Sequence, residues 1–149
     1  ADPALIDAAA VELAPGPVAA RGAEIAAAFA GYDLAAIVGR LAAHPAPWAA
    51  EALAAIRRNS PLSMAATLAL VAGYGPGTTL PEALRREYRF TWRSAEDGVT
   101  DFQEGVRALL VDKDRAPRWR YASAEAVPPA EVAALLAPLG DDDLDIEPA

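Results

Sequence analysis

Apolar residues recur every three to four positions over most of this chain, which is the period of an α-helix. One such stripe consists of Leu34, Ile37, Val38 and Leu41, and Asp33 just before it is a residue type that caps helix N-termini. No segment shows sustained alternation of apolar and polar residues, the pattern of a half-buried strand. The sequence therefore predicts an all-α fold of about six or seven helices, most of them joined by short loops that contain proline or glycine.

Start and stop signals place the boundaries of these helices. Ser60 followed by Pro61 predicts an N-cap and a first helical residue, and Thr79 with Glu82 has the spacing of a capping box. We expect helices over about residues 21–30, 34–41, 48–56, 61–72, 80–96 and 129–137. Gly31 is the expected C-cap of the first of these helices.

The stretch over residues 101–119, DFQEGVRALLVDKDRAPRW, joins a helical pattern to an abrupt change to charged residues. Asp101 and Glu104 have the spacing of a second capping box. The apolar stripe that follows at helical spacing is Phe102, Val106, Leu109 and Leu110. The pattern predicts a packed helix that stops in a solvated turn.

Composition shifts divide the chain into three expected parts. Residues 1–20 are expected to form a tail or linker with a possible short helix, because Pro15-Gly16-Pro17 breaks any helix near its end. Residues 21–140 form the helical domain, and residues 141–149 form an acidic C-terminal tail. The chain does not begin with methionine, which indicates a fragment or a processed chain.

Composition also excludes several classes of function. The formal net charge is −8, which argues against non-specific nucleic-acid binding. The chain has no cysteine, so disulfides and thiolate metal sites are excluded, and its single histidine cannot form a multi-histidine metal site. No apolar run approaches the roughly 18 residues that a membrane-spanning helix needs. We therefore expect a cytoplasmic protein that binds neither membrane nor nucleic acid.

Candidate chemistry is sparse. Gly73, Gly75 and Gly77 follow a predicted helix rather than a strand, so a turn is favoured over a phosphate-binding loop. His44 precedes a proline and is favoured as a surface loop residue over a catalytic base. Glu87 has apolar and aromatic neighbours, so we expect it to be half-buried, either with a raised pKa or, as we favour, in an ion pair with an arginine.

The chain has two basic groups. The first is Arg85, Arg89 and Arg93, four residues apart, for which a solvated helix face is favoured. The second follows a predicted helix C-terminus and comprises Lys113, Arg115, Arg118 and Arg120, interleaved with Pro117 and Trp119. Cations there complement the helix dipole, but cations beside an aromatic ring also suit a phosphate joined to a purine. Asp112 and Asp114 flank Lys113 and would compete for it.

The order of these motifs resembles one family. NSPLSMAATL, LPEALRREYRF, DFQEGVRALLVDKDRAPRW and LAPLGDDDL together resemble the C-terminal part of the 3-hydroxyisobutyryl-CoA hydrolases, a branch of the enoyl-CoA hydratase/isomerase (crotonase) superfamily. The resemblance covers about residues 24–145. It implies that the β-β-α core, with its oxyanion hole and catalytic glutamate, lies outside this chain. No catalytic residue is therefore assigned here.

The resemblance also implies a contact with the CoA part of an acyl-CoA thioester. In related hydratases a lysine after a Glu-Gly motif lies near the CoA adenine and phosphates, and Lys113 matches it with one extra residue in between. One residue turns a side chain by about 100° around a helix. Lys113 and Arg115 are thus the candidate CoA-binding residues, with CoA as part of the substrate and with no bound cofactor or metal.

The expected function follows from this resemblance. The chain would be the helical domain of an acyl-CoA thioester hydrolase that covers the CoA pocket, supports the missing core and turns over no substrate alone. Its expected partners are the N-terminal crotonase core of the same protein and further copies in a homo-oligomer. Two alternatives are the C-terminal domain of an enoyl-CoA hydratase/isomerase and a free-standing helical interaction module with no enzymatic role.

Overall fold

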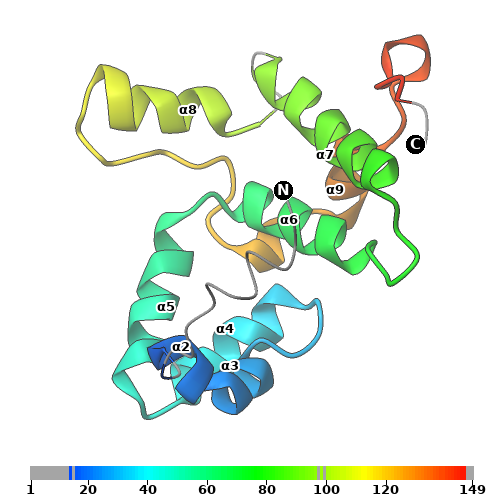
Figure 1. The fold of residues 1–149 in the computed structure, drawn as a ribbon. Coiled ribbons are helices and arrows are strands. Elements are labelled where there is room, and N and C mark those ends of the chain that lie inside the picture. The colour runs from blue at the N-terminus through cyan, green and yellow to red at the C-terminus, as the bar shows by residue number, and fades with distance from the viewer. Residues whose placement is uncertain (1–13, 15, 97, 99, 147–149) are drawn as a thin grey trace. The chain divides into compact units, whose positions relative to one another are not determined.

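The computed structural model describes residues 14, 16–96, 98 and 100–146, and every regular element in this part of the chain is helical (Figure 1). The expected all-α fold is confirmed. The described residues contain eight α-helical segments, one turn of π-helix and two 3-10 segments. The α-helical segments exceed the expected number by one, and α2 is a short segment of four residues. Most of the expected N-terminal tail lies outside the described residues.

The chain divides into two compact units, one up to Ala30 and one from Gly31 on. The described helices of the first unit are α2, Pro17–Ala20, and α3, Gly22–Ala28. Helix α3 ends earlier than expected, and Phe29 rather than Gly31 is its C-cap. Gly31 has a φ of 76°, in the left-handed region that glycine adopts without steric cost, so it turns the chain after the helix has ended.

The second unit contains the remaining elements. These are α4 Leu34–Ala43, α5 Pro47–Arg58, α6 Pro61–Ala72, α7 Leu80–Ala95, α8 Phe102–Val106, the π-helical turn η1 Arg107–Val111, the 3-10 turn η2 Ala124–Ala126, α9 Pro129–Leu136 and the 3-10 turn η3 Gly140–Asp142. Three predicted caps are confirmed. The side chains of Asp33 and Ser60 each accept a backbone N–H three residues on at 3.1 Å, and Thr79 and Glu82 form the reciprocal capping box.

The core of the second unit lies where α6, α7 and α9 meet (Figure 1). Its buried residues are Leu62, Ala66, Val127, Val132 and Leu135. Phe90 of α7 and Tyr121 pack against this cluster from its edges. Helices α4 and α5 pack against each other, and α4 contacts both α6 and η2, so the helical pair is joined to the core through α6.

The arginine face of α7 binds the C-terminal segment, so the prediction of a solvated face is wrong. Arg89 binds both carboxylate oxygens of Asp143, with distances of 2.5–3.0 Å. Arg85 donates to the carbonyls of Leu144 and Ile146, and Arg93 donates to three carbonyls at and beyond the end of α9. The three arginines share one face, as their spacing of four residues predicts, but their partners lie more than 40 residues away in the sequence.

Asp101 joins three segments that are distant in sequence. Its side chain makes no capping hydrogen bond, so the predicted second capping box is wrong. The buried carboxylate instead accepts the Ser60 hydroxyl at 2.5 Å and the Arg120 backbone N–H at 2.9 Å. The N-terminus of α6, the N-terminus of α8 and the chain that leads to η2 are therefore held at one point.

We predict that Asp101→Asn lowers the free energy of unfolding by about 1–3 kcal/mol, because the amide group turns a donor toward one of two buried donors. Urea titration of the variant and of the parent chain measures the difference. Asp141→Asn is the control, since it makes the same chemical change at an exposed position. Equal stability of the two variants would contradict the role given to Asp101.

Candidate functional site

A groove lies between α6, the end of α7, α8 with η1, and the loop that follows η1. Its volume is about 920 Å³. Its walls are mainly apolar and include Met64, Phe90, Leu109 and Trp119, whereas Arg58 and Arg115 supply cations. We call it the α8 groove. This volume and a mainly apolar lining suit a ligand that is itself largely apolar.

Several large apolar side chains of α8 and η1 lie in solvent. Phe102, Leu109, Leu110 and Val111 are 58–69% exposed, and we call them the apolar strip. The predicted stripe was expected to be packed, so that expectation is wrong for three of its four members. The helix continues past Val106 as a π-helical turn, which holds more residues per turn than an α-helix and rotates the following positions away from the predicted face.

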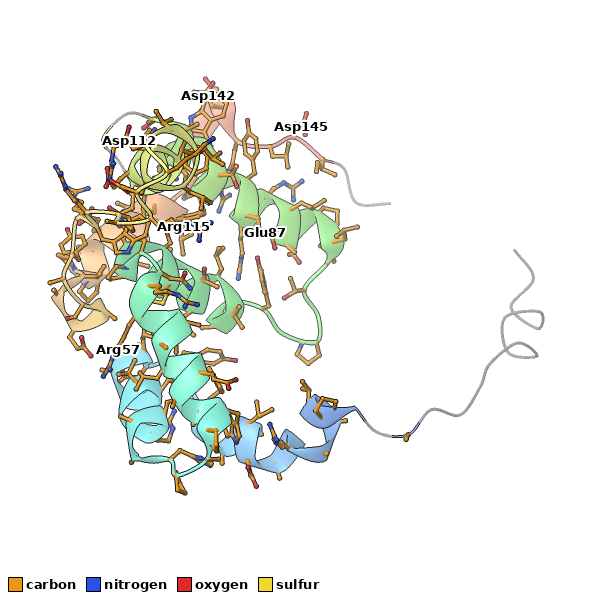
Figure 2. All side chains as sticks on the ribbon, turned by 90° about the vertical axis from the view of Figure 1, so that its left-hand side faces the viewer. Arg57, Glu87, Asp112, Arg115, Asp142 and Asp145 are labelled. Carbon is orange, nitrogen blue, oxygen red and sulfur yellow. The ribbon has the colours of Figure 1, made fainter. Side chains whose placement is uncertain are left out.

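The chain after η1 forms a loop over residues 112–118, which we call the 112–118 loop (Figure 2). Lys113 and Arg115 have φ values of 57° and 54°, in the left-handed region. That conformation costs a residue with a Cβ about 1–2 kcal/mol, so surrounding contacts must compensate. Two backbone bonds contribute, from the N–H of Asp112 to the carbonyl of Arg107 and from the N–H of Arg115 to the carbonyl of Ala108.

Arg107 makes the other contacts that hold this loop. Its guanidinium binds both carboxylate oxygens of Glu104, at 2.7 and 2.9 Å. It also donates to Asp112 at 2.5 Å, to Asp114 at 2.8 Å and to the carbonyl of Ala116 at 3.2 Å. One planar group with five donors therefore joins α8 to three positions of the 112–118 loop.

These bonds shift the pKa values of the acids around Arg107. Hydrogen bonds from Arg107, followed by the backbone N–H of Arg118 at 2.6 Å, lower the pKa of Glu104 to about 2. The pKa of Asp114 is also lowered, first by the N–H of Ala116 and then by Arg107. The carboxylates in turn raise the pKa of Arg107, Glu104 most of all. Glu104, Arg107 and Asp114 therefore all stay ionised at neutral pH.

The two predicted CoA-binding residues lie on the 112–118 loop. Both side chains are exposed, and Arg115 lines the α8 groove whereas Lys113 does not. The expected competition for Lys113 is relieved, because Asp112 and Asp114 bind Arg107. The structure thus brings Arg115 to the groove, whereas Lys113 lies outside its lining.

Other candidate residues have local structural roles. Glu87 on α7 is exposed, so the expectation that it is half-buried is wrong, and it accepts a hydrogen bond from the Tyr74 hydroxyl at 3.4 Å (Figure 2). His44 accepts the N–H of Ala46 through Nδ1 and lies against Trp48, as a loop residue would. Within the described ranges, no group of three His, Cys, Asp or Glu side chains is placed to hold a metal ion.

No helix among the described residues is both long and apolar enough to cross a lipid bilayer. This agrees with the absence of a long apolar run in the sequence.

Sequence reasoning missed Arg107 and misassigned Glu104. A usable signal was present, because Arg107 stands three residues after Glu104 and precedes two acids that flank a lysine. An arginine amid three acids predicts a multidentate ion pair. Trp119 was noted only as an aromatic neighbour, but its indole N–H donates to the carbonyl of Arg58 at 3.1 Å and ties the end of the loop to α5.

The chain belongs to the enoyl-CoA hydratase/isomerase family, whose model matches residues 3–136. Among curated proteins, the mitochondrial 3-hydroxyisobutyryl-CoA hydrolase of Gallus gallus is 36% identical over 116 residues, which cover 78% of this chain and 29% of that protein. The human mitochondrial 3-hydroxyisobutyryl-CoA hydrolase is 35% identical, over 72% of this chain and 27% of that protein. The family resemblance seen in the motifs is therefore confirmed.

Solved structures give the same kinship. A crystal structure of an enoyl-CoA hydratase from Rhodobacter sphaeroides 2.4.1 is 49% identical with a TM-score of 0.83, and the match covers 97% of this chain and 44% of that one. A carnitinyl-CoA dehydratase from Mycobacterium thermoresistibile is 35% identical with a TM-score of 0.82, over 96% and 40% of the two chains. The chain thus spans less than a third of those two curated relatives and less than half of these two structures.

We predict that the Glu104 carboxyl titrates near pH 2 and that Arg107→Ala returns its pKa toward the ordinary 4.5. Because the folded-state pKa is depressed, the stability that Glu104 contributes is present above about pH 4.5 and is lost as the pH falls toward 2. Carboxyl ¹³C NMR shifts followed from neutral pH to the acid transition give both values. Arg89→Ala is the control and should leave Glu104 unchanged. An ordinary pKa in the parent chain would contradict the prediction.

Proposed function

We propose that this chain is the helical C-terminal part of an acyl-CoA thioester hydrolase that resembles 3-hydroxyisobutyryl-CoA hydrolase. In that reaction water adds to the thioester carbonyl, the C–S bond breaks, and the products are a carboxylic acid and the CoA thiol. The groups that perform these steps belong to a crotonase core outside this chain. The described helices cover the acyl-CoA pocket of that core and support it.

The observation that carries this proposal is the apolar strip beside the cations of the 112–118 loop. Four large apolar side chains of α8 and η1 are 58–69% exposed, and large apolar side chains left in solvent are typical of an interaction surface. The remaining polypeptide of a longer enzyme is a suitable cover, since the match to the Gallus gallus hydrolase spans only 29% of that protein. Lys113 and Arg115 next to this surface would reach the CoA phosphates at its edge.

The proposed partners follow from the same argument. The core of the same protein is the main partner, and further copies in a homo-oligomer are the second. The net charge of −8 supports the absence of nucleic acid and membrane surfaces from this set. CoA enters as part of the substrate, and we propose no resident cofactor. We also propose that the protein is cytoplasmic.

An enoyl-CoA hydratase is the second candidate, because a structure with that description is 49% identical to this chain. The two activities differ in what they release. A hydrolase acting on 3-hydroxyisobutyryl-CoA liberates a thiol, whereas a hydratase consumes the double bond of a 2-enoyl-CoA and retains the thioester. Assays of the full-length protein with both substrates decide between them, and thiol release from the hydroxyacyl substrate is the expected result.

We predict that Lys113→Ala/Arg115→Ala in the full-length enzyme raises KM for acyl-CoA about 5–30-fold with kcat nearly unchanged, because charge-assisted contacts to a non-reacting part of the substrate are lost. The acyl-pantetheine substrate, which lacks the nucleotide, should show no such change. Arg21→Ala/Arg57→Ala removes the same charge at two other exposed positions and is the control. An unchanged KM in the test variant would remove both residues from the site.

We predict that the 149-residue chain associates with itself when produced alone, because the apolar strip has no cover. Sedimentation velocity across a concentration series should show growth of the average mass. Leu109→Glu/Leu110→Glu should reduce it, whereas Leu80→Glu, at an exposed leucine on α7, should not. A monomer at every concentration would contradict this use of the apolar strip.

A further inference from the structure

Contacts to Arg107 and Glu104 come from every second residue of the 112–118 loop. Asp112, Asp114 and Ala116 all bind Arg107, and the backbone N–H of Arg118 binds Glu104, the carboxylate that Arg107 also holds. Asp112 and Asp114 thus reach one ion cluster through their side chains, and Ala116 and Arg118 reach it through backbone groups. The cluster comprises Glu104, Arg107, Asp112 and Asp114, and we call it the Arg107 cluster.

Most odd-numbered residues in the range 113–119 line the α8 groove. Arg115, Pro117 and Trp119 line the α8 groove, and Lys113 is the preceding member of the same series. Arg107 binds Asp112, Asp114 and Ala116, so it holds the backbone on both sides of Lys113 and of Arg115, where φ values of 57° and 54° turn the chain. Residues 112–116 are all exposed, and therefore burial does not hold the loop in this shape.

The Arg107 cluster also affects which ion pairs Lys113 can form. Lys113 stands between two acids, and each of these acids could take its ammonium group in an ion pair. Arg107 binds Asp112 at 2.5 Å and Asp114 at 2.8 Å, so both carboxylates already have a cationic partner. The cluster thereby holds the loop shape and keeps the neighbouring acids from pairing with Lys113.

We propose that Arg107 is a positioning residue for anion binding by Lys113 and Arg115. This rests on the proposed function, which gives the anion as the phosphate-bearing nucleotide of an acyl-CoA substrate. Arg107 does not touch the substrate. It holds Asp112, Asp114 and Ala116 so that Lys113 and Arg115 are both available to one anion. Lysine cannot replace it, because an ammonium group lacks the planar fork that reaches four partners at once.

The loop shape is tested without substrate by limited trypsin digestion. Trypsin cleaves after lysine and arginine, so mass spectrometry reports the opening of the loop at Lys113 and Arg115 themselves. Arg107→Ala and Arg107→Lys should both raise the cleavage rate at these two positions about tenfold. Arg89→Ala breaks a comparable bidentate pair with Asp143 and should leave it unchanged. Equal rates in the parent and both Arg107 variants overturn the proposal.

The consequence for binding is tested by kinetics of the full-length enzyme. Arg107→Ala should raise KM for acyl-CoA by the same factor as Lys113→Ala/Arg115→Ala, and the triple variant should be no worse than the double variant, since residues that act through one another are not additive. The KM for acyl-pantetheine and the kcat for both substrates should stay within about twofold of the parent. A merely structural role would lower activity on both substrates together.

The outcomes separate the two proposals. If the double variant raises KM and Arg107→Ala does not, the CoA contact stands and the positioning role is wrong. A triple variant clearly worse than the double variant also overturns the positioning role. If the double variant leaves KM unchanged, the CoA contact is wrong and the positioning role fails with it.

Discussion

The structure of the second unit depends on one buried carboxylate. Asp101 accepts hydrogen bonds from Ser60 and from the backbone of Arg120, groups that lie 41 and 19 residues away along the chain. A buried carboxylate is costly unless such donors satisfy it, so the arrangement that satisfies Asp101 is strongly preferred over alternatives. It fixes where α8 leaves the core formed by α6, α7 and α9. The positions of η1 and the 112–118 loop follow from that departure point.

Local and distant contacts explain what the sequence could and could not predict. Thr79 and Glu82 form the predicted capping box because both partners lie within one turn and no distant group competes. Asp101 and Glu104 have the same spacing, but Asp101 binds Ser60, which lies 41 residues away, and Glu104 binds Arg107 on the next turn. The distant partner of Asp101 cannot be read from spacing. The same limit applies to the arginine face of α7, whose periodicity was evident while its carbonyl partners were not.

The candidate site was predictable in its residues but not in its geometry. Lys113 and Arg115 stand out as cations after an apolar helical stretch. Their left-handed backbone was not expected, since lysine and arginine have no preference for it. Arg107 explains this conformation, because its bonds to Asp112 and Asp114 offset the cost of the left-handed backbone. A strained loop beside a groove is a typical place for function.

An acidic chain can hold a local anion site because electrostatic interactions are screened over about 8 Å at physiological salt. The net charge of −8 is therefore a weak guide to the field at the 112–118 loop. Asp143 is paired with Arg89 on α7, and the acids nearest Lys113 are paired with Arg107. The cations that remain exposed set the local potential. The apolar strip next to them supplies the surface against which the rest of the enzyme would exclude water and strengthen that potential.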